Sequence, residues 1–261
     1  MQLTGSALVT GGGSGIGLAC ATRLAADGAA VTLMGRSGER LEVGRARLLE
    51  AVPSARVSVA AGDVAEEGAV EAAVATATAA GPLRHVVAAA GVGAAGPLTD
   101  QDVDAWERVL AVNLTGAMLT VKHAARSMVA HGDGGSIVAI SSIAGGLTHR
   151  LMTAYCVSKA GLEMLVRNAA DELGAHGIRV NAVRPGLVPT EIADGLVSNE
   201  GIVADYLAQM PISRLGATDD IAEGVRYLAG PESGWVTGQI LAIDGGHTLR
   251  RGPDLLAGRS P

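Results

Sequence analysis

The chain has 261 residues, of which 48% are hydrophobic and 2% aromatic, and it contains no Phe. This hydrophobic content excludes a disordered chain and requires a core of Ala, Val, Leu, Ile and Met. A net charge of −6 argues against nucleic-acid binding, and no apolar run reaches the roughly 18 residues that span a membrane. Two distant cysteines and no signal-peptide pattern indicate a reduced, cytoplasmic protein.

Short β-branched segments alternate with longer segments of helical spacing. The expected strands are 7–10, 30–34, 56–60, 84–90, 136–141, 178–183 and 239–243. The expected helices are about 16–27, 39–51, 66–80, 102–131, 154–175 and 218–229. Such alternation is typical of βαβ units, and nearly continuous apolar strands indicate a sheet covered on both faces. We therefore expect an α/β fold: a doubly wound, Rossmann-type, seven-stranded parallel sheet with helices on both faces.

The domain organisation is simple. No linker, charge block or internal repeat marks a second domain, so residues 1–248 are expected to form one domain. Residues 187–215 follow the sixth strand, where insertions commonly form ligand-covering lids. Residues 249–261 form a C-terminal tail, which we expect to pack on an assembly through Leu255 and Leu256.

A glycine-rich turn joins the first strand to the first helix, with the pattern T-G-x-x-x-G-x-G from Thr10 to Gly17. Glycines let the backbone approach a pyrophosphate, and the helix N-terminus offers free N–H groups with a partial positive charge. The alternative is a purely structural turn, because the G-x-G-x-x-G fingerprint does not fit. The turn residues expected to bind a cofactor are Gly11, Gly13, Ser14, Gly15, Ile16 and Gly17.

A second pattern carries acid–base chemistry. Tyr155 and Lys159 stand four apart in a predicted helix and so share one face, about 5–6 Å apart at Cβ. A nearby ammonium is expected to lower the tyrosine pKa from its usual value near 10 and so allow proton exchange with an alcohol or carbonyl. Ser141 and Ser142 end the fifth strand beside the crevice where such sheets bind ligands.

Taken together, these motifs resemble the short-chain dehydrogenase/reductase family over about residues 3–248. The resemblance rests on the glycine turn, Asn113, Ser142 thirteen residues before Tyr155, Pro185-Gly186, and the closing Asp-Gly-Gly at 244–246. It implies a dinucleotide-binding catalytic domain: an NAD(P)-dependent oxidoreductase that interconverts a secondary alcohol and a ketone by hydride transfer.

The resemblance also implies roles for single residues. Ser142 would bind the substrate oxygen, and Tyr155 would be the acid–base. Lys159 would hold the nicotinamide ribose and lower the tyrosine pKa, while Asn113 would position a water that leads from Lys159 to solvent.

Further cofactor contacts follow by position. Asp63 with Val64 would meet adenine, the backbone of Ala90 and Gly91 would meet ribose, and Thr190 would bind the carboxamide. The remaining cofactor positions implied are Pro185, Gly186 and Val188. Residues 88–91 read Ala-Ala-Ala-Gly where the family has Asn-Asn-Ala-Gly, which is expected to cost hydrogen bonds that tether the strand.

The second strand ends in Gly35-Arg36-Ser37, where an NAD-selective site would place an acid. Arg36 and Ser37 therefore favour NADP(H), because a guanidinium can meet a 2′-phosphate. Ser14 replaces a second basic residue found in many relatives that use NADP, so one cation is expected there. The alternative is that Arg36 stacks on adenine and NAD(H) is used.

Two other functions were weighed. A catalytically idle dinucleotide-binding or scaffold protein has no need of a matched acid–base group, and enoyl reductases generally space Tyr and Lys more widely. The expected substrate is a small, apolar molecule, and no His or Cys pair has metal-ligand spacing. His149 faces either the substrate or solvent, and Trp106 and Trp235 are interpreted as core or interface anchors.

The helix that carries Tyr155 has a second apolar stripe that one core cannot cover. Its members are Val157, Ala160, Gly161, Met164 and Leu165. Relatives pair through this helix and the one near 102–131, so we expect a homo-oligomer, a tetramer, with no nucleic-acid or membrane partner.

Overall fold

The computed structural model describes residues 2–249. Its sheet has the order β3-β2-β1-β4-β5-β6-β7, and every pair of neighbouring strands is parallel. The strands are β1 (Ser6–Thr10), β2 (Ala30–Gly35), β3 (Val57–Ala61), β4 (Leu83–Ala88), β5 (Gly135–Ile140), β6 (Ile178–Pro185) and β7 (Ile240–Ile243). The expected doubly wound parallel sheet is confirmed. The order reverses between β1 and β4, which opens a crevice at their carboxyl ends.

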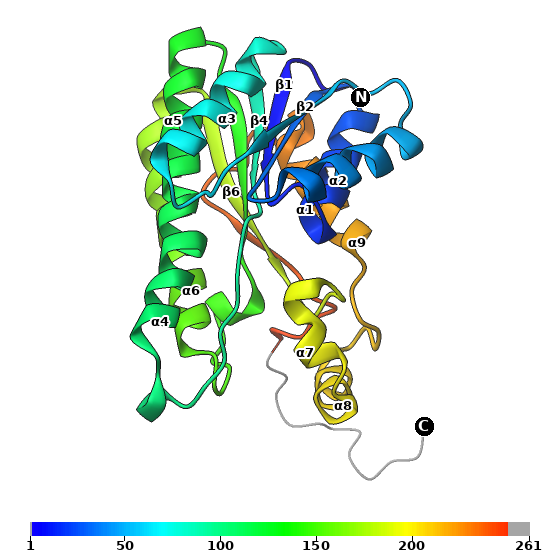
Figure 1. Cartoon of the computed structure of the whole chain (residues 1–261), viewed down its shortest axis with the longest axis vertical. Helices are drawn as coiled ribbons and strands as arrows, with labels where there is room; N and C mark the ends of the chain where they lie inside the picture. Colours follow the sequence, from blue (N-terminus) through cyan, green and yellow to red (C-terminus); the bar gives the residue numbers. More distant parts are fainter. Residues whose placement is uncertain (1, 250–261) are drawn as a thin grey trace.

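Helices cover both faces of the sheet (Figure 1). One layer contains α1 (Gly15–Ala26), α2 (Gly38–Ala51) and α9 (Thr218–Ala229). The other contains α3 (Glu67–Ala79), α4 (Val103–Leu110), α5 (Gly116–His131) and α6 (Thr153–Leu173). Each layer encloses its own apolar core, built from aliphatic side chains such as Leu24 and Ile221 on one face and Met128 and Leu162 on the other. Leu, Ile, Val, Ala and Met therefore fill the core of a chain that has no Phe.

The helix expected at 102–131 is interrupted. A π-helical turn at Ala111–Thr115 separates α4 from α5 and places Asn113 in its middle. Such turns insert one extra residue into a helix and are frequent at functional sites. The periodic apolar pattern did not indicate this break.

Residues 187–215 form a subdomain at the carboxyl ends of the strands, where α7 (Asp194–Val197) and α8 (Glu200–Gln209) project below the sheet in Figure 1. The sequence pattern did not indicate these two helices. Asn199 caps α8, since its side chain accepts hydrogen bonds from the N–H groups of Gly201 and Ile202. A lid role for these residues stays a prediction. The tail residues 250–261, including Leu255 and Leu256, lie outside the described part of the chain.

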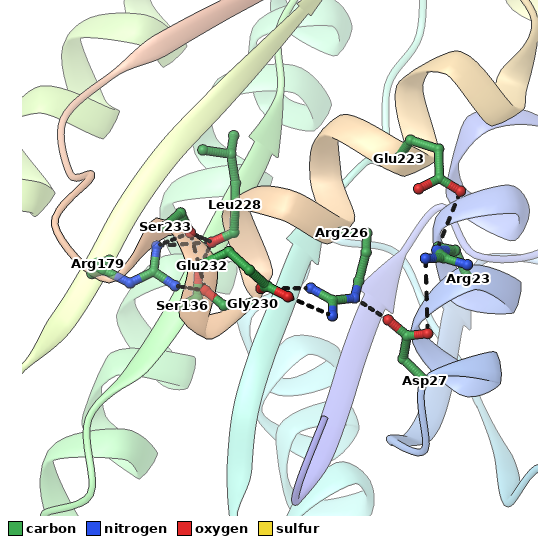
Figure 2. Close-up of polar contacts among 10 residues, drawn as sticks. All are labelled: Arg23, Asp27, Ser136, Arg179, Glu223, Arg226, Leu228, Gly230, Glu232 and Ser233. Atoms are coloured by element: carbon green, nitrogen blue, oxygen red, sulfur yellow. Dashed lines mark hydrogen bonds and ion pairs between the residues drawn. The ribbon is translucent and has the colours of Figure 1, made fainter. Parts of the chain in front are cut away.

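An ion-pair network fastens α9 to α1 (Figure 2). The buried Arg226 guanidinium donates to Asp27 at the end of α1 and to Glu232, at 3.0 Å. Arg23 lies 3.3 Å from Glu223 and 3.9 Å from Asp27. This network therefore joins two helices that are far apart in the sequence but lie in the same layer of the fold.

Beside that network, Arg179 of β6 donates to the carbonyl of Leu228, in the last turn of α9, and to the carbonyl of Gly230, which follows the helix. These bonds satisfy carbonyl groups at a helix C-terminus. Trp235 nearby is fully exposed, so of the two roles expected for it, core anchor or interface anchor, the structure excludes the core. No helix within residues 2–249 is long and apolar enough to cross a membrane.

Candidate active site

A cleft of about 340 Å³ lies at the carboxyl ends of β1 to β4. Most of the predicted turn, ribose and adenine positions line it. The lining is Gly11, Gly13, Ser14, Gly35, Arg36, Ser37, Arg40, Leu41, Gly62, Asp63, Val64, Ala90, Gly91, Val92, Arg108 and Val112. A second depression, around Val129 and Gly177, lies at the amino ends of β5 and β6, away from these groups.

The glycine turn has the geometry of a close backbone approach. Gly11 has φ +66°, and a Cβ there would lie 2.9 Å from Cα of Ala90. A Cβ on Gly17 would lie 2.2 Å from the carbonyl oxygen of Gly11. Only glycine fits at these two positions, and α1 begins directly behind the turn at Gly15. The N-terminus of α1 therefore faces the cleft, as a pyrophosphate requires.

The end of β4 is tethered in spite of its alanines. The Thr10 hydroxyl accepts from the N–H groups of Ala89 and Ala90, at 3.2 and 3.3 Å. This holds the Ala90-Gly91 backbone at the edge of the cleft. The hydrogen bonds from Thr10 thus partly offset the predicted loss of bonds that tether the strand.

Sequence reasoning missed Arg40. Ser37 caps α2 by accepting from the backbone N–H of Arg40, which brings the Arg40 side chain into the cleft that Arg36 lines. Arg40 donates to the Ser14 hydroxyl, at 3.2 Å, and to Glu191 of the lid. The expectation of a single cation at this end of the cleft is therefore wrong. The signal was present, since Arg40 lies four residues after Arg36, in the first turn of α2.

Asp63 follows β3, where the sequence predicted it, but it already has a partner. Arg108 of α4 donates to Asp63 at 2.7 Å. Burial acts to raise the Asp63 pKa, but bonds from the Ala65 N–H and Arg108 outweigh it and lower the pKa. Val64 beside it packs against Gly116, where a Cβ would lie 2.7 Å from Val64 Cγ2. This side of the cleft therefore carries a fixed ion pair between Asp63 and Arg108.

Tyr155, Ser142 and Lys159 meet at the carboxyl end of β5. The Ser142 hydroxyl lies close enough to the Tyr155 phenol to lower its pKa. Lys159 Nζ lies 5.6 Å from the centre of the Tyr155 ring and donates to the carbonyl of Ile140 at 2.8 Å. Burial lowers the Lys159 pKa to about 8, although the nearby Glu163 carboxylate acts in the opposite direction.

The expected lowering of the Tyr155 pKa is wrong for this chain. Burial raises that pKa, and the nearby Ser142 hydroxyl offsets only part of the rise. The Lys159 ammonium is directed at the Ile140 carbonyl and not at the phenol oxygen, which explains why it does not reverse the effect of burial. At neutral pH the phenol is therefore protonated, as a proton donor must be.

Asn113 connects the π-helical turn to the chain segment after β4. Its amide accepts from the Val92 N–H at 2.8 Å and donates to the Val92 carbonyl at 2.9 Å. It also donates to Ser158 at 3.0 Å. Asn113 thus fixes the floor of the cleft against the helix that carries Tyr155 and Lys159.

The segment after β6, where the sequence predicts nicotinamide contacts, lies between the end of β7 and the glycine turn. Gly186 donates to the Ile243 carbonyl, and a Cβ on Gly186 would lie 2.9 Å from Cα of Asp244. Val188 is buried, and the Thr190 methyl group would lie 3.3 Å from a Cβ on Gly15. The lid start therefore sits directly over the glycine turn. Pro185 is the last residue of β6, and Ile16 lies in the first turn of α1.

A polar cluster borders the site on the lid side. His149 Nε2 lies 3.1 Å from the Tyr206 hydroxyl, and the Tyr206 and His247 rings are 4.9 Å apart. Burial raises the Tyr206 pKa, and the nearby Tyr155 raises it further, which places this cluster on the catalytic side. Of the two positions considered for His149, the structure supports the one that faces the site.

Comparisons with known proteins agree with this geometry. Residues 11–248 match a family model described as enoyl-(acyl carrier protein) reductase. The chain is 41% identical over 244 residues to cis-4-hydroxycyclohexanecarboxylate dehydrogenase of Sinomonas cyclohexanicum, covering 93% of this chain and 96% of that one. It is 40% identical, with TM-score 0.91, to a short-chain type dehydrogenase/reductase of Mycobacterium ulcerans, covering 98% and 94%.

This chain belongs to the short-chain dehydrogenase/reductase family. A further solved member, the gluconate 5-dehydrogenase of Burkholderia cenocepacia in complex with NADP and tartrate, is 32% identical with TM-score 0.89 and covers 95% of this chain and 96% of that one. The protein is thus an NAD(P)-dependent oxidoreductase that interconverts alcohol and carbonyl groups.

Proposed function

We propose that this family member transfers hydride between NADP(H) and a secondary alcohol or ketone, with Tyr155 as the acid–base. The observation that carries the proposal is the meeting of Ser142, Tyr155 and Lys159 at the carboxyl end of β5. Lys159 Nζ lies 5.6 Å from the centre of the tyrosine ring and would lie 3.8 Å from a Cβ on Gly91, which lines the glycine-turn cleft. The nicotinamide supplies or accepts the hydride at the carbinol carbon. Asn113, which ties the cleft floor to α6, fixes the distance between the two halves of the site.

In the reducing direction the ketone gains a hydride at carbon and a proton at oxygen. Ser142 donates a hydrogen bond to that oxygen as it becomes negative, and the Tyr155 hydroxyl gives up its proton to it. The Tyr155 phenolate then stands above the Lys159 ammonium, which stabilises it. Oxidation of an alcohol reverses each step. A raised Tyr155 pKa suits the reducing direction, because the acid is loaded at neutral pH.

The cofactor preference rests on Arg36 and Arg40. Both line the cleft beside Gly35, which leaves room where an NAD-selective site would carry an acid. Two guanidinium groups can share a 2′-phosphate, and Arg40 is already oriented toward Ser14. The phosphate would compete with Glu191 of the lid for Arg40.

The substrate we propose has an apolar body and one polar group remote from the reacting carbon. The sequence indicated an apolar substrate, yet His149, Tyr206 and His247 add hydrogen-bonding groups on the lid side. The Sinomonas relative acts on a ring alcohol that bears a carboxylate. A matched pair of ketones, cyclohexanone and 4-oxocyclohexanecarboxylate, isolates the contribution of that polar group.

Reduction of a carbon–carbon double bond is the second candidate, favoured by the description of the matching family model. The three-residue gap between Tyr155 and Lys159 favours the alcohol reaction. Oxidation of NADPH and NADH with the two ketones and with an enoyl thioester decides between them. Turnover of the enoyl substrate alone would overturn the ketone assignment.

The assembly we propose is a cytoplasmic homotetramer. Val157 and Met164 on the outer face of α6 are 44% and 53% exposed, and Met118 of α5 is 37% exposed. These apolar side chains form the stripe that a second copy of the chain would cover. Trp235, beside the edge strand β7, offers a separate anchor. Cys20 is buried and unpaired, in keeping with a reducing compartment.

A further inference from the structure

A buried carboxylate lies one helical turn beyond Lys159. Glu163 has only 3% of its surface exposed and is bound from two sides. Its Oε1 accepts from the Ser141 hydroxyl and from Nε of Arg184, both at 2.9 Å, and its Oε2 accepts from Nη2 of Arg184 at 2.6 Å. The Arg184 fork is therefore bidentate, which is the strongest form of this pair.

The chain backbone packs tightly around this pair. A Cβ on Gly145 would lie 2.5 Å from Oε1 of Glu163, and a Cβ on Gly146 would lie 2.8 Å from Nη1 of Arg184. Both glycines belong to the loop that starts at Ser142. The pair thus connects the end of β6 to α6, which carries Tyr155 and Lys159, and to the end of β5, which Ser142 follows.

Stability alone is a weak reason for such an arrangement. Removing two charges from water costs several kcal/mol per ion, and replacing a buried ion pair with apolar residues is often neutral or stabilising. What an apolar pair cannot supply is a fixed negative charge beside Lys159.

We propose that Glu163 is a positioning residue for the alcohol–ketone reaction. Its carboxylate keeps the buried Lys159 in the charged form, and Arg184 and Ser141 hold that carboxylate in place. Arg184 has an opposing effect of its own, because it neutralises part of the field that Glu163 exerts on Lys159. This inference deepens the proposed function and rests on it.

The surroundings of Lys159 leave Glu163 as the acidic group that acts on it. From α6 it faces Tyr155 and Glu163, and from β5 the Ile140 carbonyl. Asn113 of the π-helical turn is neutral, and Asp244 after β7 acts on Arg184. Burial brings the Lys159 pKa to about 8 while Glu163 raises it, so loss of that carboxylate would discharge Lys159 within the neutral range.

The sequence offers a direct test, because Lys122 and Lys159 are its two lysines. Carbon-13-labelled lysine would give two side-chain signals whose pH titration can be followed by NMR without cofactor or substrate. Lys122 is paired with Glu67 at 2.6 Å on a half-exposed surface, so its signal serves as the internal control.

Glu163→Gln should lower the Lys159 pKa by about 1 unit or more, because the field of the carboxylate is lost. Arg184→Gln should raise it, because Glu163 then acts without its counter-charge. The alkaline limb of ketone reduction should shift in the same two directions. Glu163→Asp, which keeps the charge, should leave the Lys159 pKa close to its wild-type value.

Opposite shifts separate this role from damage to packing, which would move both variants the same way. Lys159 shifts of the same sign in the two variants, or no shift in either, would overturn the inference. If Glu163→Gln does not fold, Arg184→Gln and Ser141→Ala still test the inference. Ser141→Ala removes one hydrogen bond to the Glu163 carboxylate and leaves its charge unchanged. The NMR result stands whatever happens to the reaction assignment, which Tyr155→Phe tests separately.

Discussion

The Tyr206 hydroxyl lies 3.1 Å from Nε2 of His149 and so joins lid helix α8 to the loop that carries Ser142. Nδ1 of His149 lies 3.3 Å from the Leu147 carbonyl, which can only accept. Nδ1 therefore carries a hydrogen, and in the neutral ring Nε2 accepts from Tyr206. A substrate oxygen that reaches Tyr206 would replace or extend this bond.

Tyr206→Phe is expected to raise KM for 4-oxocyclohexanecarboxylate by about 3–10-fold, the effect of one lost hydrogen bond. The KM for cyclohexanone should stay the same, because it has no second polar group. Steady-state kinetics on the two ketones checks this, with Tyr227→Phe as the matched control on exposed α9. Equal effects on both ketones would contradict a polar subsite.

Tyr155→Phe removes one hydroxyl and keeps the ring. Turnover should fall at least about 100-fold, because the proton donor is lost, while cofactor affinity persists. NADPH fluorescence titration and initial rates measure the two quantities separately. A variant that retains most of its activity would remove Tyr155 from the reaction.

Arg36→Ala and Arg40→Ala should each reduce kcat/KM for NADPH by about 10–100-fold and leave NADH nearly unchanged. The physical reason is that a 2′-phosphate loses a charge-assisted hydrogen bond, whereas a 2′-hydroxyl does not. Arg45→Ala on the same helix, paired with Glu42, is the control. Wild-type preference for NADH would show that NAD(H) is the cofactor, and an unchanged NADPH preference in both variants would show that these two arginines do not set it.

Asp27→Asn should lower the free energy of unfolding by about 1–3 kcal/mol, because the buried Arg226 loses an ionised partner between α1 and α9. Thermal unfolding of the variant should show a lower Tm, with Asp104→Asn on α4 as a control. Equal Tm values would mean that the remaining partners of Arg226, Glu232 among them, satisfy it without Asp27.

The sequence was sufficient for features that depend on local pattern. Alternating apolar segments predicted all strands of the described sheet to within a few residues, and the glycine turn predicted the cleft. It was insufficient where the partner comes from a distant element. Arg108 meets Asp63 across the cleft, and Arg184 meets Glu163 from another strand, so neither pairing has a local signature.

The pKa of Tyr155 failed as a prediction for a related reason. Helical spacing correctly places Lys159 beside the tyrosine, but it does not say what else the ammonium can bind. The Ile140 carbonyl comes from β5, and burial depends on the whole fold. The direction in which the Lys159 ammonium points and the desolvation of the phenol, rather than distance alone, decide the sign of the Tyr155 pKa shift.

Met164→Glu tests the proposed assembly. Its side chain is 53% exposed on α6, and a charge there would be buried against the same stripe of a second copy, at the cost of an unpaired ion. Light scattering should then report smaller species for the variant than for the wild type. Val43→Glu, at a 50% exposed position on α2 in the opposite layer, should leave the assembly intact. A wild-type protein that is monomeric at all concentrations, or a Met164→Glu variant of unchanged mass, would contradict an α6 interface.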